Sequence, residues 1–396
     1  MNQPHNNPKL IQIIQDKIAN SPQRKITFAA YMDLVLYHPE EGYYSSGTVD
    51  IGKAGDFFTA SSLGKDFGEL LAEQFVEMWE ILGKPNPFDL VEMGAGKGEL
   101  ANDILNYLSQ QHPEFYQGLQ YCIIEQSPAL KQAQKKKLQT WQEAGILTWK
   151  TWEEIPNLSL VGCCFSNELV DAFPVHRVQV EAGKLKEIYV THASEEASSL
   201  FTEVTDEIST PKLREYFETV GISLPSSAYE DGFQTEVHLA VETWLSAIAQ
   251  RLKKGYLLTI DYGYTAERYY HPQRYSGTLQ CYTQHQRHND PYYRIGQQDM
   301  TSHVDFTALE VYGKKYDLAY YHFTQQALFL MALGLGDRLG KLSQRTLDMR
   351  QLLKRRDALH QLIDPMGLGG FGVLLQGKGL EEAEKTFPLR GFQEAG

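Results

Sequence analysis

The sequence predicts an α/β protein whose strands form a mainly parallel sheet. The first observation is residues 88–105, FDLVEMGAGKGELANDIL, where a short apolar run meets three glycines and continues into residues with helical spacing. The second is that similar apolar runs with polar carboxyl ends recur at 120–125, 160–165 and 255–260. This order of strand, turn and helix is typical of an open α/β sheet, which binds its ligand beyond the carboxyl ends of the strands.

Three helices are expected before the first of these strands, over residues 7–20, 27–37 and 62–82. Each carries apolar residues on one face, and Thr27 is placed to cap the second helix. The amino-terminal part of the chain is therefore predicted to be helical.

Residues 42–62 form a loop without periodicity between the second and third helices. It is much longer than the usual connection between elements, and such loops in compact domains are often functional. Gly55, Phe58 and Thr59 combine a glycine, an aromatic ring and a hydroxyl that could close over a cofactor. The alternative is a surface loop whose phenylalanines plug the adjacent helices.

The turn at residues 94–98 carries the main signal for a ligand. Gly94, Ala95, Gly96 and Gly98 lie in it, and the alternating glycines differ from the dinucleotide fingerprint, whose third glycine comes three positions after the second. Glu92 would repel a pyrophosphate and attract a ligand that carries an ammonium and a sulfonium group. S-adenosylmethionine carries both cations, although glycine turns are common and Glu92 could simply face solvent.

The second strand, 120–125, ends in Glu125. A carboxylate at this point suits the two hydroxyls of a ribose, so Glu125 is the expected ribose anchor. Residues 146–152 are expected to form the third strand.

The fourth strand, 160–165, delivers a second group of polar residues to the same edge of the sheet. Asn167, Glu168 and Asp171 follow it directly. Two carboxylates there could grip a guanidinium at two points or accept the proton of an amine as it is methylated. The alternative is that residues 167–171 only cap a helix.

Residues 181–250 interrupt the alternation of strands and helices with a polar hairpin-like piece, an acidic loop and then amphipathic helices, and we expect a mainly helical insertion there. A fifth strand follows at 255–260, and helices are expected over 324–339 and 343–363. The last strand, 371–376, is predicted at an edge of the sheet.

One later loop raises the question of a metal site. Its histidines and aspartates lack a compact ligand repeat, so a polar loop facing the substrate is favoured and no metal is expected. The residues concerned are His285, His288, Asp290, His303 and Asp305.

Composition narrows the class of partner and the compartment. The 396 residues carry a net charge of −13 with no long block of Lys or Arg, which argues against nucleic acid as the main partner. Four cysteines without metal-ligand spacing favour a reducing setting. Because no signal sequence, transit peptide or membrane-spanning run is evident, we expect a cytoplasmic protein that does not insert into a membrane.

The motifs in combination resemble the MidA-like family of S-adenosylmethionine-dependent methyltransferases, which includes a mitochondrial complex I assembly factor that methylates a protein arginine. The match covers nearly the whole chain and keeps the family's order of motifs. These are GYY, GDFFT, LVEMGAGKGELANDIL, SNELVDAFPVHRV, IDYG, GTLQCY and DMTSHVDFTAL.

The resemblance implies a Rossmann-like class I methyltransferase sheet of seven mostly parallel strands. It implies a helical amino-terminal region with a cofactor-covering loop over 1–83, a core over 84–180 and 251–396, and a substrate-facing insertion over 181–250. S-adenosylmethionine would be the cofactor and S-adenosylhomocysteine the product.

The resemblance also assigns roles to single residues. Glu92 and the glycines would surround the methionine part, Glu125 the ribose, Thr151 or Trp152 the adenine, and Phe58 and Thr59 would cover the donor. The acceptor would face Asn167, Glu168 and Asp171, which position the guanidinium and receive its proton.

The acceptor implied by the family is an arginine of a protein, and a respiratory complex subunit is one candidate. Alternatives are a small-molecule methyltransferase and an assembly factor that binds S-adenosylmethionine without turnover. The glycine spacing and Glu92 disfavour a nicotinamide dehydrogenase. Surface helices within 324–363 could serve a homodimer or only the core.

Overall fold

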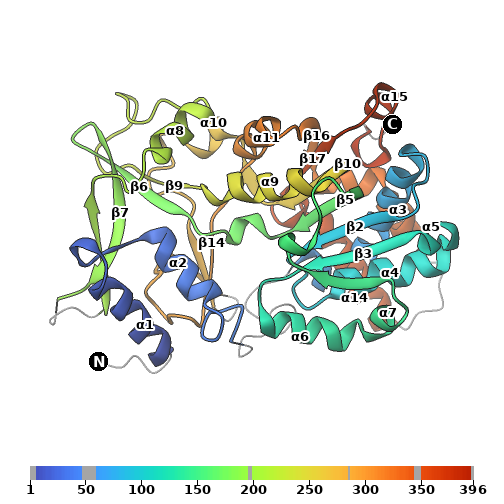
Figure 1. The fold of residues 1–396 in the computed structure, drawn as a ribbon, viewed down its shortest axis with the longest axis horizontal. Helices are drawn as coiled ribbons and strands as arrows, with labels where there is room; N and C mark the ends of the chain where they lie inside the picture. Colours follow the sequence, from blue (N-terminus) through green and yellow to red (C-terminus); the bar gives the residue numbers. More distant parts are fainter. Residues whose placement is uncertain (1–5, 47–58, 195–198, 284–285, 343–348, 394–396) are drawn as a thin grey trace.

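The computed structural model describes residues 6–46, 59–194, 199–283, 286–342 and 349–393. Figure 1 shows two parts side by side. A large seven-stranded sheet with helices on both faces forms one part, and a smaller antiparallel sheet with the amino-terminal helices forms the other.

The large sheet has the strand order β16-β17-β10-β5-β2-β3-β4. Its five strands from β10 to β4 run parallel, and β17 is antiparallel to both of its neighbours. This confirms the predicted α/β class and the seven mostly parallel strands. The strands are β2 (Phe88–Met93), β3 (Leu119–Ile124), β4 (Leu147–Lys150), β5 (Leu160–Asn167), β10 (Leu252–Asp261), β16 (Ala319–Gln325) and β17 (Gly372–Lys378).

Two apolar cores lie on the two faces of this sheet. One core includes residues of α3 (Asp66–Ile81), α4 (Glu99–Gln111), α12 (Gln326–Ala332) and α14 (Met349–Ile363). The other includes residues of α8 (Lys212–Thr219), α9 (Ala240–Arg251) and α11 (Phe306–Lys315). The remaining α-helices of this part are short: α5 (Pro113–Gln117), α6 (Pro128–Lys137), α7 (Gln139–Glu143), α10 (Ala266–Tyr269), α13 (Leu335–Leu342) and α15 (Glu382–Thr386).

The expected mainly helical insertion over 181–250 is wrong in its secondary structure. The segment contributes most of a five-stranded antiparallel sheet, and of its two helices only α8 lies wholly inside it. Polar residues alternate with apolar ones in β6, and β7 and β9 carry buried polar side chains such as Glu187 and Glu236, so the segment lacks the apolar runs by which buried strands are recognised. The sheet comprises β1 (Ile26–Thr27), β6 (His176–Glu181), β7 (Lys184–His192), β8 (Phe201–Asp206) and β9 (Gln234–Val237).

The amino-terminal helices α1 (Pro8–Ala19) and α2 (Phe28–Tyr37) contact β7 of this second sheet. Asn7 caps α1 and Thr27 caps α2 through their side chains, as the sequence predicted for Thr27. Their apolar faces share a third core with residues of β7, β8 and β12. This packing ties the start of the chain to segments more than 150 residues later, so the amino-terminal helices form one packed unit with β7 and β8 of the insertion.

The last part of the large sheet also differs from the expectation. The strand β17 is not at the edge, because β16 pairs with its free side and takes the edge position. Most side chains of β16 are exposed or half-buried, which removes the apolar run by which a strand is recognised. The predicted helix over 324–339 therefore begins two residues late, at Gln326, and is split into α12 and α13.

Two small sheets join the two parts. One comprises β12 (Gln280–Thr283), β13 (Gln286–His288) and β14 (Asp299–Thr301), and the other comprises β11 (Gly263–Tyr264) and β15 (Val304–Asp305). Figure 1 shows β14 between the second sheet and the large sheet. The carboxyl ends of β2, β3, β5 and β10 therefore lie close to residues of both parts.

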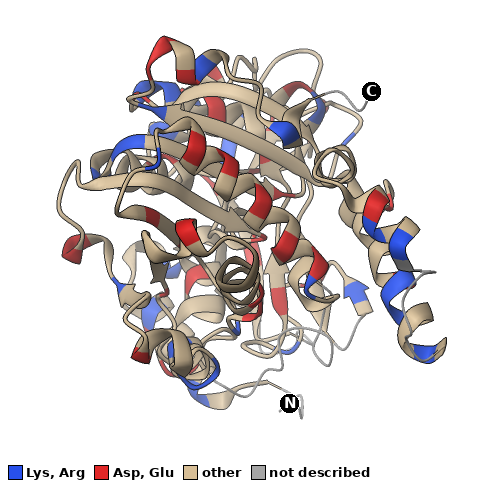
Figure 2. Ribbon diagram, turned by 90° about the vertical axis from the view of Figure 1, so that its right-hand side faces the viewer, with Lys and Arg blue, Asp and Glu red and all other residues tan. Residues whose placement is uncertain are grey.

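Charges of both signs are mixed over the surface of the sheet helices (Figure 2). All four cysteines are buried and free. In the described ranges no helix is both long and apolar enough to cross a bilayer, and no group of three or more His, Cys, Asp and Glu side chains is placed to hold a metal.

Candidate active site

The glycine turn after β2 has the backbone geometry that glycine permits. Gly94, Gly96 and Gly98 have φ values of 71°, 52° and 79°, in the left-handed region. A Cβ on Gly94 would lie 2.6 Å from Cδ1 of Leu169, whereas a Cβ on Gly96 would meet nothing within 4 Å. Gly96 therefore opens toward free space, while Gly98 is the N-cap of α4 and faces Leu138.

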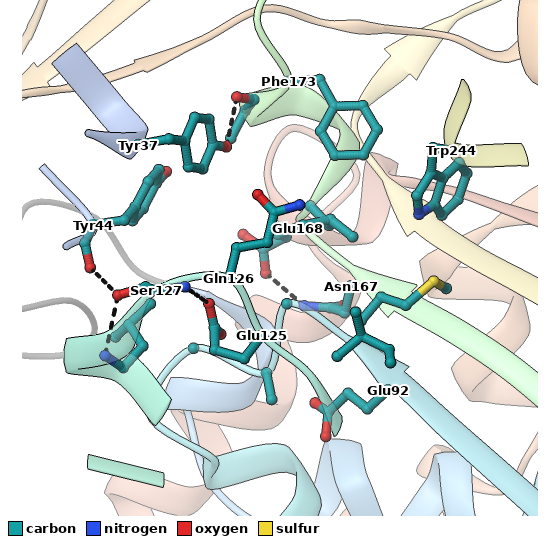
Figure 3. Close-up of a pocket in the computed structure, with 18 of the residues that line it drawn as sticks. Tyr37, Tyr44, Glu92, Glu125, Gln126, Ser127, Asn167, Glu168, Phe173 and Trp244 are labelled. Atoms are coloured by element: carbon teal, nitrogen blue, oxygen red, sulfur yellow. Dashed lines mark hydrogen bonds between the residues drawn. The ribbon is translucent and has the colours of Figure 1, made fainter. Parts of the chain in front are cut away.

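A cavity of about 690 Å³ lies at this turn, within the usual size range of small-molecule sites. Residues at the carboxyl ends of β2, β3 and β5 form its base, and residues of α2 and α9 form other walls. Figure 3 shows Glu92 toward one end and the rings of Tyr37, Phe173 and Trp244 toward the other, with Glu168 between them.

Glu92 is a buried carboxylate in the cavity wall. Its side chain is 3% exposed, and the Tyr121 hydroxyl donates a hydrogen bond of 2.6 Å to Oε2. Burial raises the pKa of Glu92 to about 7, with smaller contributions from the charges of Glu125 and Glu99. A cation bound beside Glu92 would restore its charged form.

Glu125 is held in place by two donors. The Ser127 amide donates to Oε1 at 2.8 Å, and the Gln134 side chain donates to Oε2 at 2.9 Å. Burial raises the pKa of Glu125, and these hydrogen bonds oppose the increase. The carboxylate is thus oriented at the end of β3, where the sequence placed it.

Gln134 is a positioning residue that the sequence did not reveal. It is fully buried, and its Nε2 also donates to the Gly96 carbonyl at 2.8 Å. The Trp149 indole donates in turn to Gln134 Oε1 at 2.8 Å. One amide therefore links the glycine turn to Glu125, and glutamine in a lysine-rich surface helix gives no signal of this role.

Glu168 lies in the cavity wall with an unusual backbone. Its φ of 51° is left-handed, and its Oε1 accepts hydrogen bonds from the Ala60 amide at 3.0 Å and the Asn167 side chain at 3.1 Å. Burial raises the pKa of Glu168 to about 8, and the carboxylate of Asp171 adds to the increase. The Oδ1 atom of Asn167 is buried and has no partner among the described residues.

Asp261 at the end of β10 fixes the segment that follows β5. Its Oδ2 accepts hydrogen bonds from the amides of Leu169, Val170 and Asp171 at 3.2, 2.9 and 3.3 Å, and its Oδ1 accepts one from Tyr262 at 2.9 Å. Three consecutive amides around one oxygen form an anion nest. Asp261 is therefore a positioning residue for the segment that carries Glu168.

Aromatic residues line the end of the cavity away from Glu92. The rings of Phe173 and Trp244 meet edge to face at 5.8 Å, and Tyr37 and Tyr44 stack at 5.5 Å. The Tyr37 hydroxyl donates to the Ala172 carbonyl at 2.7 Å, whereas the buried Trp244 Nε1 has no acceptor among the described residues. No sequence pattern indicates these rings, because they lie on α2, α9 and two loops far apart in the chain.

The structure brings most of the predicted site residues to one cavity. Asp171 and Thr151 do not line it: Asp171 is buried behind Glu168 beside Asp261, and the exposed Thr151 caps a short helical turn with Glu154. Gly98 also lies outside the lining, and Gly55 and Phe58 fall outside the described residues. The predicted residues that line the cavity are Thr59, Glu92, Gly94, Ala95, Gly96, Glu125, Trp152, Asn167 and Glu168.

Comparison with known families identifies the chain. A family model described as an S-adenosyl-L-methionine-dependent methyltransferase matches residues 70–324, which include the glycine turn, Glu125 and Glu168. The chain belongs to this methyltransferase family.

Several relatives match the methyltransferase over most of its length. The protein arginine methyltransferase NDUFAF7 homolog, mitochondrial, of Drosophila melanogaster is 30% identical, over 93% of this chain and 85% of its own. Human protein arginine methyltransferase NDUFAF7, mitochondrial, is 28% identical over 93% and 83%. A crystal structure from Burkholderia thailandensis bound to S-adenosyl-homocysteine has a TM-score of 0.80 at 26% identity, covering 98% of this chain and 96% of that one.

The cavity of the methyltransferase fits its cofactor, S-adenosylmethionine. Glu92 offers a negative charge near the open space at Gly96, which suits the ammonium and sulfonium groups. The carboxylate of Glu125 is the second one in the site and is oriented for hydroxyl groups, and Trp152 and Leu130 add apolar surface. The Asn167 amide oxygen and the Trp244 indole N–H remain without a hydrogen-bond partner among the described residues.

Proposed function

We propose that this methyltransferase transfers the methyl group of S-adenosylmethionine to an arginine side chain of a protein. The observation that carries the proposal is the charge of the cavity. Among the described residues that line it, five carry a carboxyl group and one is a lysine, and a bound cation favours the ionised forms of the two with strongly raised pKa values, Glu92 and Glu168. An acidic cavity suits a cationic acceptor beside a cationic donor, and the names of the NDUFAF7 relatives support arginine as that acceptor.

The residues past β5 match the shape of a guanidinium. Glu168 Oε1 already accepts two hydrogen bonds, so Oε2 is the oxygen left for an N–H donor, and the unpartnered Oδ1 of Asn167 is a second acceptor for another N–H of the same guanidinium. Phe173 and Trp244 have flat faces for a planar cation, which aromatic rings attract. Together they favour a guanidinium over a compact ammonium group.

The transfer itself is a direct displacement. The lone pair of a guanidinium nitrogen forms a bond to the methyl carbon, the bond from that carbon to sulfur breaks, and the sulfonium becomes a neutral thioether. The nitrogen loses a proton, and Glu168 in its ionised form is placed to receive it. Positioning of the two ligands by the cavity supplies most of the acceleration.

The proposal is tested by incubating the purified chain with lysate and S-adenosylmethionine that carries a labelled methyl group. We expect label in protein, released on hydrolysis as methylated arginine, and none with Glu168→Gln. Label recovered only in small molecules would contradict the protein acceptor. A Glu168→Gln variant with normal labelling would contradict the assigned role, and a chain that binds the cofactor but labels nothing would favour a non-catalytic assembly role.

Three finer parts of the proposal concern partner, assembly and location. We propose a respiratory complex subunit as the acceptor, from the resemblance to the MidA-like family, and mass spectrometry of labelled protein tests it. A homodimer is supported by the exposed Leu328 and Met331 on α12, and sedimentation tests it. We propose a cytoplasmic location, whereas the names of the relatives say mitochondrial. Cell fractionation tests the location.

A further inference from the structure

Two arginines share one aromatic ring near the end of β10. The guanidinium carbons of Arg268 and Arg274 lie 4.4 and 4.5 Å from the ring centroid of Tyr264. The two like charges are therefore less than about 9 Å apart, a distance at which they repel each other. His303 stacks on the same ring, with centroids 4.9 Å apart and planes 8° from parallel.

A third arginine adds to the same positive region. The pKa of His303 is lowered to about 4, first by burial and then by Arg274, Arg287 and Arg268, so all three guanidinium groups act on one imidazole. Arg268 and Arg287 are exposed and Arg274 is half-buried. We call these three residues the arginine cluster.

No carboxylate compensates the arginine cluster among the described residues. None of its three members has an ion pair there, although acids outnumber bases and the net charge of the chain is −13. Arg274 Nε and His303 Nδ1 are in addition buried and have no hydrogen-bond partner among the described residues. Buried polar atoms are usually paired, and because Arg274 Nε can only donate, this position favours a ligand with acceptor atoms.

The arginine cluster is close to Asp261, which binds the segment 169–171 next to Glu168. Tyr264 is three residues from Asp261, so their Cα atoms are at most about 10 Å apart. Asp261 binds the amides of residues 169–171, and the ring of Tyr262 meets the ring of His303 edge to face at 5.2 Å. The cluster does not line the cavity, so it would meet residues of a bound polypeptide that lie outside the cavity.

We propose that the arginine cluster binds carboxylate side chains of the protein that accepts the methyl group. This inference rests on the proposed function. Guanidinium groups bind carboxylates through paired N–H donors, and the three groups come from α10, the loop after it and β13. Charges spread in this way match acidic side chains spaced along a peptide. The acceptor arginine would therefore have acidic residues near it in sequence.

The test uses a fluorescein-labelled hexaglutamate peptide and the full-length chain. Binding is measured by fluorescence anisotropy at low and high salt for the wild type and for the triple variant R268Q/R274Q/R287Q. A matched control, K136Q/K253Q/K354Q, also removes three positive charges, from exposed residues on α6, the start of β10 and α14. We expect the triple variant to bind at least about tenfold more weakly, the control to match the wild type, and salt to weaken binding.

The cofactor serves as the independent measure of an intact site. We expect the three proteins to bind S-adenosylmethionine equally in calorimetric titration, and the triple variant to show a raised KM for the protein acceptor with an unchanged kcat. Two results would overturn the inference and leave the proposed function standing. One is a wild type that binds the cofactor but not the peptide, and the other is a triple variant that binds the peptide as well as the control does. Failure of the wild type to bind the cofactor would refute the proposed function itself. Inorganic phosphate that displaces the peptide at equal concentration would overturn the choice of carboxylate.

Discussion

The raised pKa of Glu168 makes the pH dependence of methyl transfer the sharpest test of its role. The pKa is about 8 because the carboxyl is buried and lies near Asp171. At pH 7 only about one tenth of the enzyme would have Glu168 ionised, and at pH 9 about nine tenths. If the ionised form binds the guanidinium and receives its proton, kcat/KM for the acceptor rises about tenfold between these pH values. The substrate guanidinium does not titrate in this range, so it does not contribute.

The assay measures transfer of labelled methyl groups to the acceptor at saturating S-adenosylmethionine from pH 6 to 9.5. Saturation keeps the Glu92 site occupied, so its own titration is removed from the profile. We expect one rising limb with a pKa near 8 and a plateau above it. In Glu168→Gln the limb disappears and the rate falls at least about 100-fold, whereas the affinity for the cofactor stays within about threefold.

Asp171→Asn supplies a second, directional check. The charge of Asp171 raises the pKa of Glu168, so its removal moves the rising limb to lower pH. A wild-type profile that is flat between pH 7 and 9, or a Glu168→Gln variant with more than about a tenth of the normal rate, would refute the reasoning. A limb that stays in place in Asp171→Asn would show that the two carboxyl groups do not interact.

Three further predictions concern the cofactor and the acceptor. Because Glu92 has a pKa of about 7, about half of its carboxyl groups are protonated at pH 7, and binding of the cationic S-adenosylmethionine should release about half a proton. Calorimetric titration should then give a binding enthalpy that changes with the ionisation enthalpy of the buffer. Glu92→Gln should remove this dependence on the buffer. Gly96→Val should abolish cofactor binding because the valine side chain would enter the cavity. Gly183→Val is the control: Gly183 has a similar left-handed φ of 70° and equally free space, so the variant should lose a similar free energy of unfolding and still bind the cofactor. Trp244→Phe keeps the ring and removes the unpaired N–H, so KM for the acceptor should rise about fivefold with cofactor affinity unchanged; an unchanged KM would exclude a bond from the indole.

The parts of the site that are local in sequence could be predicted from it. The glycine turn combines strand, turn and helix within 18 residues, and the side chain of Glu92 follows from its place in β2. Glu125 follows in the same way from the end of β3. In each case the backbone of one element determines where the side chain lies, so one sequence carries enough information.

Contacts between distant segments could not be predicted. Gln134 bonds to the Gly96 carbonyl 38 residues earlier, and Asp261 bonds to amides about 90 residues earlier. The aromatic rings on α2 and α9 meet in the cavity only because the second sheet packs beside the large one. These residues have no local pattern, and the sequence indicated a polar hairpin at β6 and β7 but not the five-stranded sheet that positions α2.

Asp171 was predicted to face the acceptor, but it does not line the cavity. Read as a helix, residues 167–171 would place Glu168 and Asp171 on one face, because residues three apart share a face of a helix. The left-handed φ of Glu168 breaks that spacing, and the bonds from three amides to Asp261 turn the segment so that Asp171 packs beside Asp261. One carboxylate then remains in the cavity wall and a second lies just beneath it. In that position Asp171 acts on the acceptor only through Glu168, by raising its pKa, and the pH profile of methyl transfer is the measurement that separates this role from direct contact.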